Sequence, residues 1–376
     1  MKGADPGHWA FDLYEPSRGG SPVNRKKLTS RDKNLINGKP GPESAHTRGG
    51  GSEFSWGPTS VGKEGTRDYQ TAQWAADQLK AEHEKPFFLA VGLSKPHLPF
   101  YVPQEFFDLH DSATTKANEI REDDLKDILT PSGKPKHRPT ADYLWLKENG
   151  LIDECARAYL AACSYADACL GVIFEALKKS PSYDNTIVVV WGDHGWHLGE
   201  KLRYRKATGW IESTRVPLLL RMPGMKGRQD CGACVNLIDF YPTLIELCDL
   251  PSKENLDGRS FAPLLKDPTR EWSHATLTIH GEGNSSITDG SWHYLRYREG
   301  TEEFYDLKND PMEWRNLMGG ELSAPALAGK ERLEKLVPTK FAKGVPVQNS
   351  AEKARLKKTR ALDQTIKARR RLAELK

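Results

Sequence analysis

The chain has 376 residues, of which 38% are hydrophobic and 28% charged, with 32 glycines and 24 prolines. This composition indicates a polar, loop-rich globular protein with one large domain or a large domain and a smaller companion, and it excludes a membrane-spanning protein. The net charge of +4 does not indicate a nucleic-acid-binding protein, because residues 351–376 hold ten Lys or Arg against three Asp or Glu, which leaves about −3 for the remainder.

Residues 1–66 are rich in Gly, Pro, Ser and Lys and show no sustained period, so irregular mid-domain loops are predicted there. The next stretch, Tyr69–Glu84, has apolar residues at helical spacing and predicts a helix. Pro86 then begins "PFFLAVGL", a short apolar run that predicts a buried strand.

A second helix is predicted over Leu151–Lys179, whose apolar residues recur every three or four positions. The runs "NTIVVVWGD" and "VPLLLRM" follow it and predict strands covered on both faces. Asp239 is placed to cap a further helix, "FYPTLIELCDL". Because strands and helices alternate, we expect an α/β fold with a central, mostly parallel sheet flanked by helices over 67–255.

Beyond residue 255 the pattern changes to short alternating runs, "ATLTIH" and "SWHYLRYR", joined by turns. These predict a small C-terminal antiparallel subdomain over 256–323, followed by a polar, basic tail over 324–376. Such a tail is most often a solvated helix or a frayed end, and binding to a polyanion is the less favoured interpretation.

The six cysteines predict neither a disulfide framework nor a metal site. Three of them, Cys155, Cys163 and Cys169, lie on the long predicted helix, where small thiols serve as core residues. Cys231 and Cys234 have the spacing of a redox or metal pair, but no second pair or histidine ligands accompany them.

Two predicted strands end in polar residues, and ligands of α/β sheets bind beyond such ends. The first strand leads to Lys95 and His97, and the second to Asp193 and His194. Asp193 offers oxygen ligands to a divalent cation, whereas His194 has either a ligand role or a structural role. Lys206 carries a positive charge for an anionic substrate, or else belongs to a solvated basic loop.

Five motifs now stand in the order found in sulfatases: "KPFFLAVGLSKPHLPF", "VVVWGDHGWHLGEK", "ESTRVPLLLRMPG", "LDGRSFAPLL" and "FYDLKNDPMEWRNL". Over Trp56–Leu317 the chain resembles the iduronate-2-sulfatase-like branch of that family, within the alkaline-phosphatase-type superfamily. The resemblance implies a sulfuric ester hydrolase acting on sulfated carbohydrate, with an alkaline-phosphatase-like fold and a periplasmic or extracellular location.

The same resemblance implies roles for individual residues. Asp193 and His194 are expected to bind Ca²⁺, and His97 and Lys206 are expected to contact the sulfate oxygens. Lys95, in the same loop as His97, is a candidate for substrate binding. Cations and a protonatable histidine near the ester suit this chemistry, because negative charge develops on the sulfuryl oxygens and the leaving alkoxide.

The family's nucleophile, a formylglycine made from a C-x-P/A-S-x-R-type motif, has no counterpart among the 376 residues, because none of the six cysteines begins such a motif. Tyr14–Arg18 echoes the end of the motif, but tyrosine cannot become the aldehyde. The paired aspartates of the first strand and the Gly-Lys-x-x-His motif are also missing. We therefore expect an N-terminally incomplete chain, inactive alone, that lacks the first strands and binds Ca²⁺ weakly.

Two alternatives remain open from the sequence. One is a non-catalytic remnant that binds sulfated glycans through Lys95, His97 and Lys206. The other is a phosphodiesterase or phosphonate hydrolase of the same superfamily, whose Asp-His-Gly stretch is similar.

Overall fold

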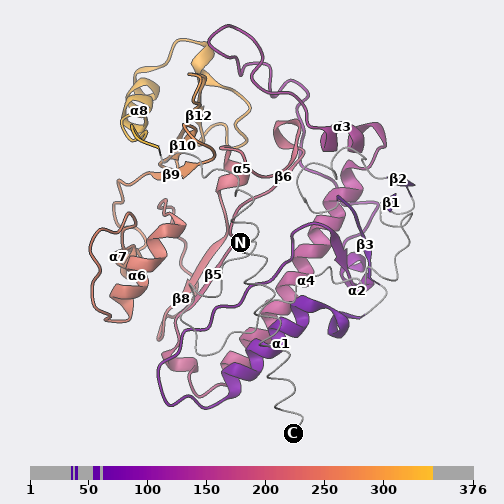
Figure 1. The fold of residues 1–376 in the computed structure, drawn as a ribbon, viewed down its shortest axis with the longest axis vertical. Coiled ribbons are helices and arrows are strands. Elements are labelled where there is room, and N and C mark those ends of the chain that lie inside the picture. The colour runs from indigo at the N-terminus through magenta and orange to yellow at the C-terminus, as the bar shows by residue number, and fades with distance from the viewer. Residues whose placement is uncertain (1–34, 37–38, 41–53, 60–61, 342–376) are drawn as a thin grey trace, which may run out of the picture.

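Two helices packed along their length form the centre of the fold (Figure 1). The computed structural model describes residues 35–36, 39–40, 54–59 and 62–341. The helices are α1 (Arg67–Lys80) and α4 (Ile152–Lys178), and both confirm the helical periods of the sequence. Ala76 and Leu79 of α1 share one buried cluster with Ala176 and Leu177 of α4.

Helix α4 is long and apolar enough, by length and composition, to cross a membrane. In the structure it packs against α1, against the short helix α2 (Gln104–Asp108) and against the strand β4 (Phe100–Val102). Cys155 and Cys169 lie fully buried on it, as predicted for core thiols. The long helix is therefore the element around which the large domain assembles.

The core begins before residue 67, which corrects the predicted boundary of the irregular segment. Strand β3 (Trp56–Pro58) pairs in parallel with β4, Trp56 opposite Phe100. Phe54 and Trp56 are both buried in the main hydrophobic cluster. Aromatic residues isolated in a Gly-rich stretch carry no period, so only their burial assigns them to the core. Upstream lie the paired strands β1 (Leu35–Ile36) and β2 (Lys39–Pro40).

The two strands predicted after α4 form as β5 (Val188–Trp191) and β8 (Leu218–Arg221), and they pair antiparallel. The parallel sheet expected from the sequence is represented in the described part of the chain only by β3 and β4. The predicted burial of β5 and β8 on both faces is also wrong: Leu219 is 61% and Trp191 47% exposed.

The strand predicted at Pro86 is absent from the structure, where residues 86–93 run without a ladder partner. Phe88 is 70% exposed, whereas Leu89 packs against the α1–α4 cluster. A strand requires hydrogen bonds from a neighbour, and the described residues supply none at this position. An apolar run can predict strand propensity but not the presence of that neighbour.

The rest of the large domain consists of short helices and strands connected by loops. Asp239 lies at the start of the predicted helix, but its carboxylate accepts from Asn236 N and Arg259 N rather than capping it. The remaining elements of the large domain are η4 (Lys63–Gly65), α3 (Ala141–Glu148), η5 (Tyr183–Asn185), β6 (His197–Leu198), η6 (Glu200–Leu202), β7 (Tyr204–Arg205), α5 (Ile211–Thr214), η7 (Leu237–Asp239), α6 (Phe240–Leu247) and α7 (Ala262–Lys266).

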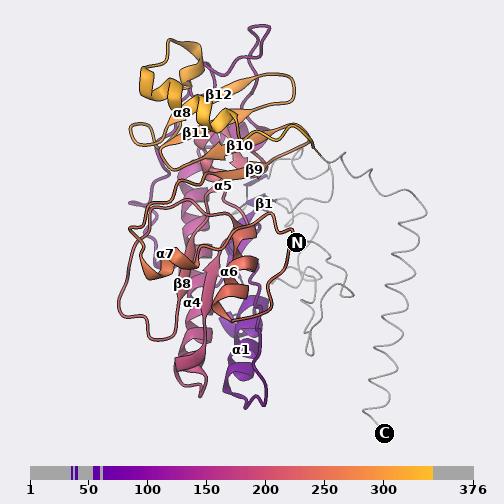
Figure 2. The same cartoon turned by 90° about the vertical axis from the view of Figure 1, so that its left-hand side faces the viewer.

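The C-terminal sheet has four antiparallel strands in the order β12-β11-β10-β9, which confirms the predicted antiparallel subdomain. The strands are β9 (Thr276–Ile279), β10 (Ser285–Thr288), β11 (Trp292–Arg296) and β12 (Glu302–Asp306). They lie at one end of the α1–α4 pair in both views (Figure 2). After them comes η8 (Leu317–Gly319).

The predicted start of the tail at residue 324 is wrong, because α8 (Ala324–Glu334) packs on this sheet. Ser323 caps the helix by accepting from Ala326 N, and Ala326 and Leu333 enter the same cluster as Tyr294 and Phe304. The helix was missed because its apolar face is narrow. Residues 342–376, with the basic run, lie outside the described part of the chain.

Candidate functional site

Three segments distant in the sequence bring the predicted site residues together. His97 comes from the loop before β4, His194 follows β5, and Lys206 follows β7. The Nζ atom of Lys206 lies 2.7 Å from Nε2 of His97, and the rings of His97 and His194 are 6.4 Å apart. The pairing of His97 with Lys206 was not readable from the sequence, which separates them by 109 residues.

The tautomer of His97 follows from its contacts. Its Nδ1 lies 2.8 Å from the carbonyl oxygen of Leu98, which only accepts hydrogen bonds, so Nδ1 carries a proton. Nε2 of the neutral ring is then the acceptor that faces Lys206. Burial lowers the pKa of His97, and the nearby positive charge of Lys206 lowers it further. The site therefore favours a neutral imidazole whose Nε2 lone pair points at an ammonium.

Trp196 forms the aromatic wall of this pair, and the sequence analysis did not single it out. Its ring lies 5.8 Å from the ring of His97 and 5.2 Å from Nζ of Lys206. The ring face attracts the ammonium and restricts where it can lie. The signal available in the sequence was the tryptophan two residues after His194, in a stretch already selected for its Asp-His pair.

Lys206 lies between two residues with left-handed backbone, Arg205 (φ 76°) and Ala207 (φ 70°). Non-glycine residues adopt this conformation at a cost and keep it only where neighbouring contacts impose it. One such contact is the ion pair between Arg205 Nε and Asp142 Oδ2, at 2.6 Å. Asp142 is thus a residue of the site's support that sequence reasoning missed.

A second contact holds the start of the same loop. Lys201, also left-handed at φ 54°, pairs with Asp124 at 2.7 Å, and each of the two side chains is only 2% exposed. The Lys201 ammonium also donates to the backbone carbonyl of Glu313, beyond the C-terminal sheet. The loop that presents Lys206 is therefore fastened to both parts of the molecule.

Asp193 and His194 lie next to each other and are more exposed to solvent than the ion pairs that support Lys206. His194 Nδ1 donates to the carbonyl of Gly195 at 2.9 Å, which leaves Nε2 available, 3.6 Å from Asp193 Oδ1. The Asp193 side chain is 72% exposed. Both side chains therefore present ligand atoms to solvent, as a metal-binding pair would.

These two residues do not make a metal site by themselves. The described residues contain no group of three or more His, Cys, Asp or Glu side chains that could hold a metal ion. Ca²⁺ takes six to eight oxygen ligands, and Asp193 with His194 supplies at most two oxygens and one nitrogen. The arrangement therefore fits part of a metal site and no more.

Gly195 has a structural role in the loop that follows His194. A Cβ atom on Gly195 would lie 2.0 Å from the carbonyl oxygen of Glu212, because the backbone here packs directly on α5. Gly195 N also donates to Ser213 O at 2.9 Å. At Gly192 a Cβ atom would meet only ordinary contacts, at 3.5 Å.

Lys95 faces inward rather than towards the His97–Lys206 pair. Its ammonium donates to the carbonyls of His97 and Pro99, inside a loop with cis peptide bonds before Pro96 and Pro99. Burial lowers the pKa of Lys95 to about 8, against the opposing effect of Asp68. Its backbone N donates to Asp68 Oδ2 at 2.8 Å. These contacts shape the loop, and substrate binding by Lys95 stays a prediction.

Comparison with protein families gives two matches along the chain. The profile described as "Sulfatase" matches residues 21–250, more than half of the chain. The profile "N-sulphoglucosamine sulphohydrolase, C-terminal" matches residues 192–337, a range that includes the four-stranded sheet and α8.

Curated relatives carry sulfatase names. A "Sulfatase" of Formosa agariphila is 33% identical over 268 residues, which cover 71% of this chain and 53% of the relative. "Arylsulfatase K" of Xenopus laevis is 27% identical over 280 residues, which cover 67% of this chain and 52% of the relative. The chain thus spans about half the length of these relatives.

Solved structures show the same fold at low sequence identity. The phosphonate monoester hydrolase of Agrobacterium radiobacter superposes with a TM-score of 0.62 at 22% identity, covering 82% of this chain and 66% of that one. A protein in complex with its substrate D-glucosamine-2-N,6-O-disulfate superposes with a TM-score of 0.51 at 19% identity, covering 71% and 68%. These likenesses confirm the alkaline-phosphatase-like fold class.

Proposed function

Because this chain belongs to the sulfatase family, we propose that it forms part of an enzyme that hydrolyses sulfuric esters of a carbohydrate. The observation that carries the proposal is the contact between Lys206 Nζ and His97 Nε2, which brings a cation and an imidazole together from distant parts of the sequence. Both residues lie within the range that the sulfatase profile matches, which supports the proposal.

The chemistry of sulfate-ester cleavage suits the two groups. Negative charge develops on the sulfuryl oxygens and on the leaving alkoxide, and a positive ammonium placed beforehand lowers the energy of that state. Lys206 would hold a sulfuryl oxygen, and Nε2 of His97 would contact the ester once the anion separates it from the ammonium. No nucleophile is among the described site residues, so we propose that the complete enzyme takes it, as formylglycine, from sequence outside these 376 residues.

Sulfatases generally use a metal ion, and for this chain we propose Ca²⁺, with Asp193 and His194 among its ligands. Support comes from the free Nε2 of His194 and the exposed carboxylate 3.6 Å from it. Titration calorimetry should show at most weak Ca²⁺ binding, reduced further by Asp193→Asn. A tight site in this chain would contradict the partial ligand set.

A sulfated carbohydrate is the substrate class we favour. The names of similar proteins support it: one relative from Formosa agariphila is called "Ulvan-active sulfatase", and a structural neighbour holds a disulfated glucosamine. A periplasmic or extracellular location is proposed with it, from the resemblance to exported sulfatases.

An aryl sulfate provides the test of the proposed activity. We expect 4-nitrophenyl sulfate to bind to the chain without turnover, since the nucleophile is missing. Lys206→Ala should weaken this binding roughly tenfold, the order of one lost charge-assisted hydrogen bond. Lys253→Ala, which removes an exposed lysine by Tyr241, is the matched control.

Three outcomes would change the proposal. Turnover by this chain would show that another nucleophile operates. Tighter binding of a phenylphosphonate monoester than of the aryl sulfate would favour a phosphonate hydrolase. The non-catalytic remnant would be favoured by a third result: the chain is stable and binds sulfated glycans, but it stays inactive when the N-terminal segment of a sulfatase is added.

A further inference from the structure

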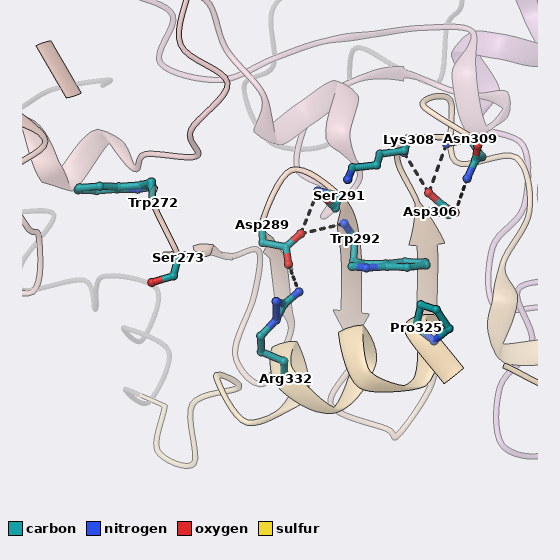
Figure 3. A pocket seen from close by; sticks show the side chains of 10 residues that line it. All are labelled: Trp272, Ser273, Asp289, Ser291, Trp292, Asp306, Lys308, Asn309, Pro325 and Arg332. Carbon is teal, nitrogen blue, oxygen red and sulfur yellow. Dashed lines mark hydrogen bonds and ion pairs between the residues drawn. The ribbon is translucent and has the colours of Figure 1, made fainter. Parts of the chain in front are cut away.

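A cavity of about 500 Å³ lies at the edge of the C-terminal sheet, where the β10–β11 turn, the end of β12 and α8 meet (Figure 3). Trp272 and Trp292 line it, together with polar side chains that include Asp289, Lys308 and Arg332. A volume of this size lies within the range of small-molecule sites, and most of the residues in the lining are polar, with the two tryptophans as its aromatic surfaces.

The cavity is separate from the His97–Lys206 pair. Strand β10 touches the segment that follows Lys206 through Ser286, whose hydroxyl donates to Gly209 O at 2.7 Å. The cavity begins beyond the other end of β10, at Asp289 in the turn to β11. None of the residues that line it belongs to the loops carrying His97, His194 or Lys206.

The carboxylates in the cavity already have donors. Asp289 accepts from the backbone N of Ser291 and of Trp292, both at 2.9 Å, and forms an ion pair with Arg332. Asp306 likewise accepts from Lys308 N and from Asn309 Nδ2. Arg332 neutralises Asp289, whereas Asp306 accepts only from neutral donors and keeps its charge, so Asp306 and Lys308 are the charged groups of the described lining that have no ion-pair partner.

The Lys308 ammonium is the group left available. Its side chain is exposed, and it has no side-chain partner among the residues that the structure describes. Figure 3 shows its side chain extending towards Ser291, with Arg332 and Pro325 on the opposite side of the Trp292 ring. A cation and an aromatic side chain in one cavity suit a ligand with both an anionic group and an apolar face.

Both tryptophans are held in place before any ligand binds. Trp292 stacks on Phe304 with ring centroids 5.1 Å apart and planes at 15°, and Gly329 of α8 packs so closely that a Cβ there would lie 2.8 Å from the ring. Trp272 is fixed by a 2.9 Å hydrogen bond from Nε1 to Cys234 O. Rigid aromatic walls lose little conformational freedom on binding.

We propose that this cavity binds one sulfated sugar unit, with the pyranose against the tryptophans and the sulfate at Lys308. The substrate class rests on the proposed function, but the site does not depend on the catalytic groups. Bound there, a sugar polymer would be anchored by a unit away from the ester at His97 and Lys206. The C-terminal sheet would then contribute affinity for the polymer as well as support for the catalytic loop.

The test uses the full chain carrying His97→Ala and Lys206→Ala, which removes the pair proposed to hold the ester. N-acetylglucosamine 6-sulfate and its unsulfated parent are titrated by calorimetry at constant ionic strength. We expect the sulfated sugar to bind more tightly. Adding Lys308→Ala should remove this preference, a loss of roughly tenfold for one charge-assisted contact. Adding Trp272→Ala should abolish binding of both sugars.

Matched controls separate the site from general effects. Lys335→Ala removes another exposed lysine near the end of α8, and Tyr241→Ala removes an exposed aromatic ring of the large domain. Both should leave binding unchanged. Lys308→Glu should bind the unsulfated sugar more tightly than the sulfated one, because a carboxylate at this position repels the sulfate, and a misfolded variant would bind neither. No binding in the double-variant background, or binding insensitive to Lys308→Ala and Trp272→Ala, would overturn the proposal while leaving the aryl sulfate test unaffected.

Discussion

The loop that presents Lys206 and the strand end that presents Asp193 differ in how completely their groups are paired. On the Lys206 side, Lys201, Asp124, Arg205 and Asp142 form close ion pairs that are buried or nearly so. On the Asp193 side, the carboxylate is exposed, and Trp191 of β5 and Leu219 of β8 are 47% and 61% exposed. The part of the site that we propose to hold the anion is thus closely supported by ion pairs, whereas the part that we propose to bind a metal is open to solvent.

The difference also indicates where stability resides. Buried charges are tolerated only when each has a partner, so the Lys206 side depends strongly on every member of its network. Exposed groups on the Asp193 side can change at little cost to folding. Variants on the two sides should therefore differ sharply.

The largest effect is expected from Asp124→Ala. The substitution leaves the Lys201 ammonium buried without its carboxylate, and breaking such a pair costs about 3–5 kcal/mol of unfolding free energy. Denaturant unfolding measures it. Asp193→Ala is the matched control on the other side and should change stability by less than about 0.5 kcal/mol. Equal losses in the two variants would contradict the contrast drawn between the two sides.

Gly195→Ala should follow, with a loss of about 1–3 kcal/mol from overpacking. Its Cβ would lie 2.0 Å from the carbonyl oxygen of Glu212, and backbone atoms cannot move aside easily. In Gly192→Ala the new Cβ would lie 3.5 Å from its nearest neighbours, an ordinary contact distance, so the stability should hardly change. The melting temperatures of both variants test whether close backbone packing constrains the loop that carries Asp193 and His194. A stable Gly195→Ala variant would show that α5 can move.

Glu303→Gln tests the buried network through pH. Burial by itself would raise the pKa of Glu303, but its partners outweigh that effect and hold the pKa at about 2: His137, Tyr297 and Tyr305. A lowered pKa stabilises the fold above the unfolded value of 4.5, and this contribution is lost as the pH falls towards 2.

Glu303→Gln should therefore be less stable than the parent near pH 7 and approach it near pH 2. Unfolding in denaturant at a series of pH values measures the difference. The exposed Glu331→Gln variant is the control and should follow the parent throughout. A constant gap between Glu303→Gln and the parent across the series would assign the loss to packing rather than to the carboxylate's charge.

The smallest effect is expected from Asp142→Asn. The amide keeps the shape of the carboxylate but loses its charge, so Arg205 and the Lys206 beside it are held less firmly. Affinity for 4-nitrophenyl sulfate should fall by a factor of about two to five, the order of a weakened, partly exposed ion pair. Asp142→Glu should recover part of the affinity, which a merely structural role for Asp142 would not predict.

Much of the fold was predictable because the relevant signals are local. The periods of α1 and α4 and the alternation of the C-terminal strands follow from which side chains must be buried in each element. The two errors, the strand wrongly predicted at residues 86–93 and the helix α8 that was not predicted, arise because these segments depend on non-local contacts. A strand needs a neighbour, and a helix with a narrow apolar face gains its stability from the surface it covers.

The sequence by itself determined the residue types at the site, since Asp193 and His194 follow an apolar strand and His97 and Lys206 stand in ordered motifs. Only the tertiary structure decided how they are used. It joins His97 to Lys206 against Trp196, turns Lys95 inward, and leaves Asp193 exposed. Local patterns record what each segment needs to bury, whereas distances between segments depend on packing across the whole fold.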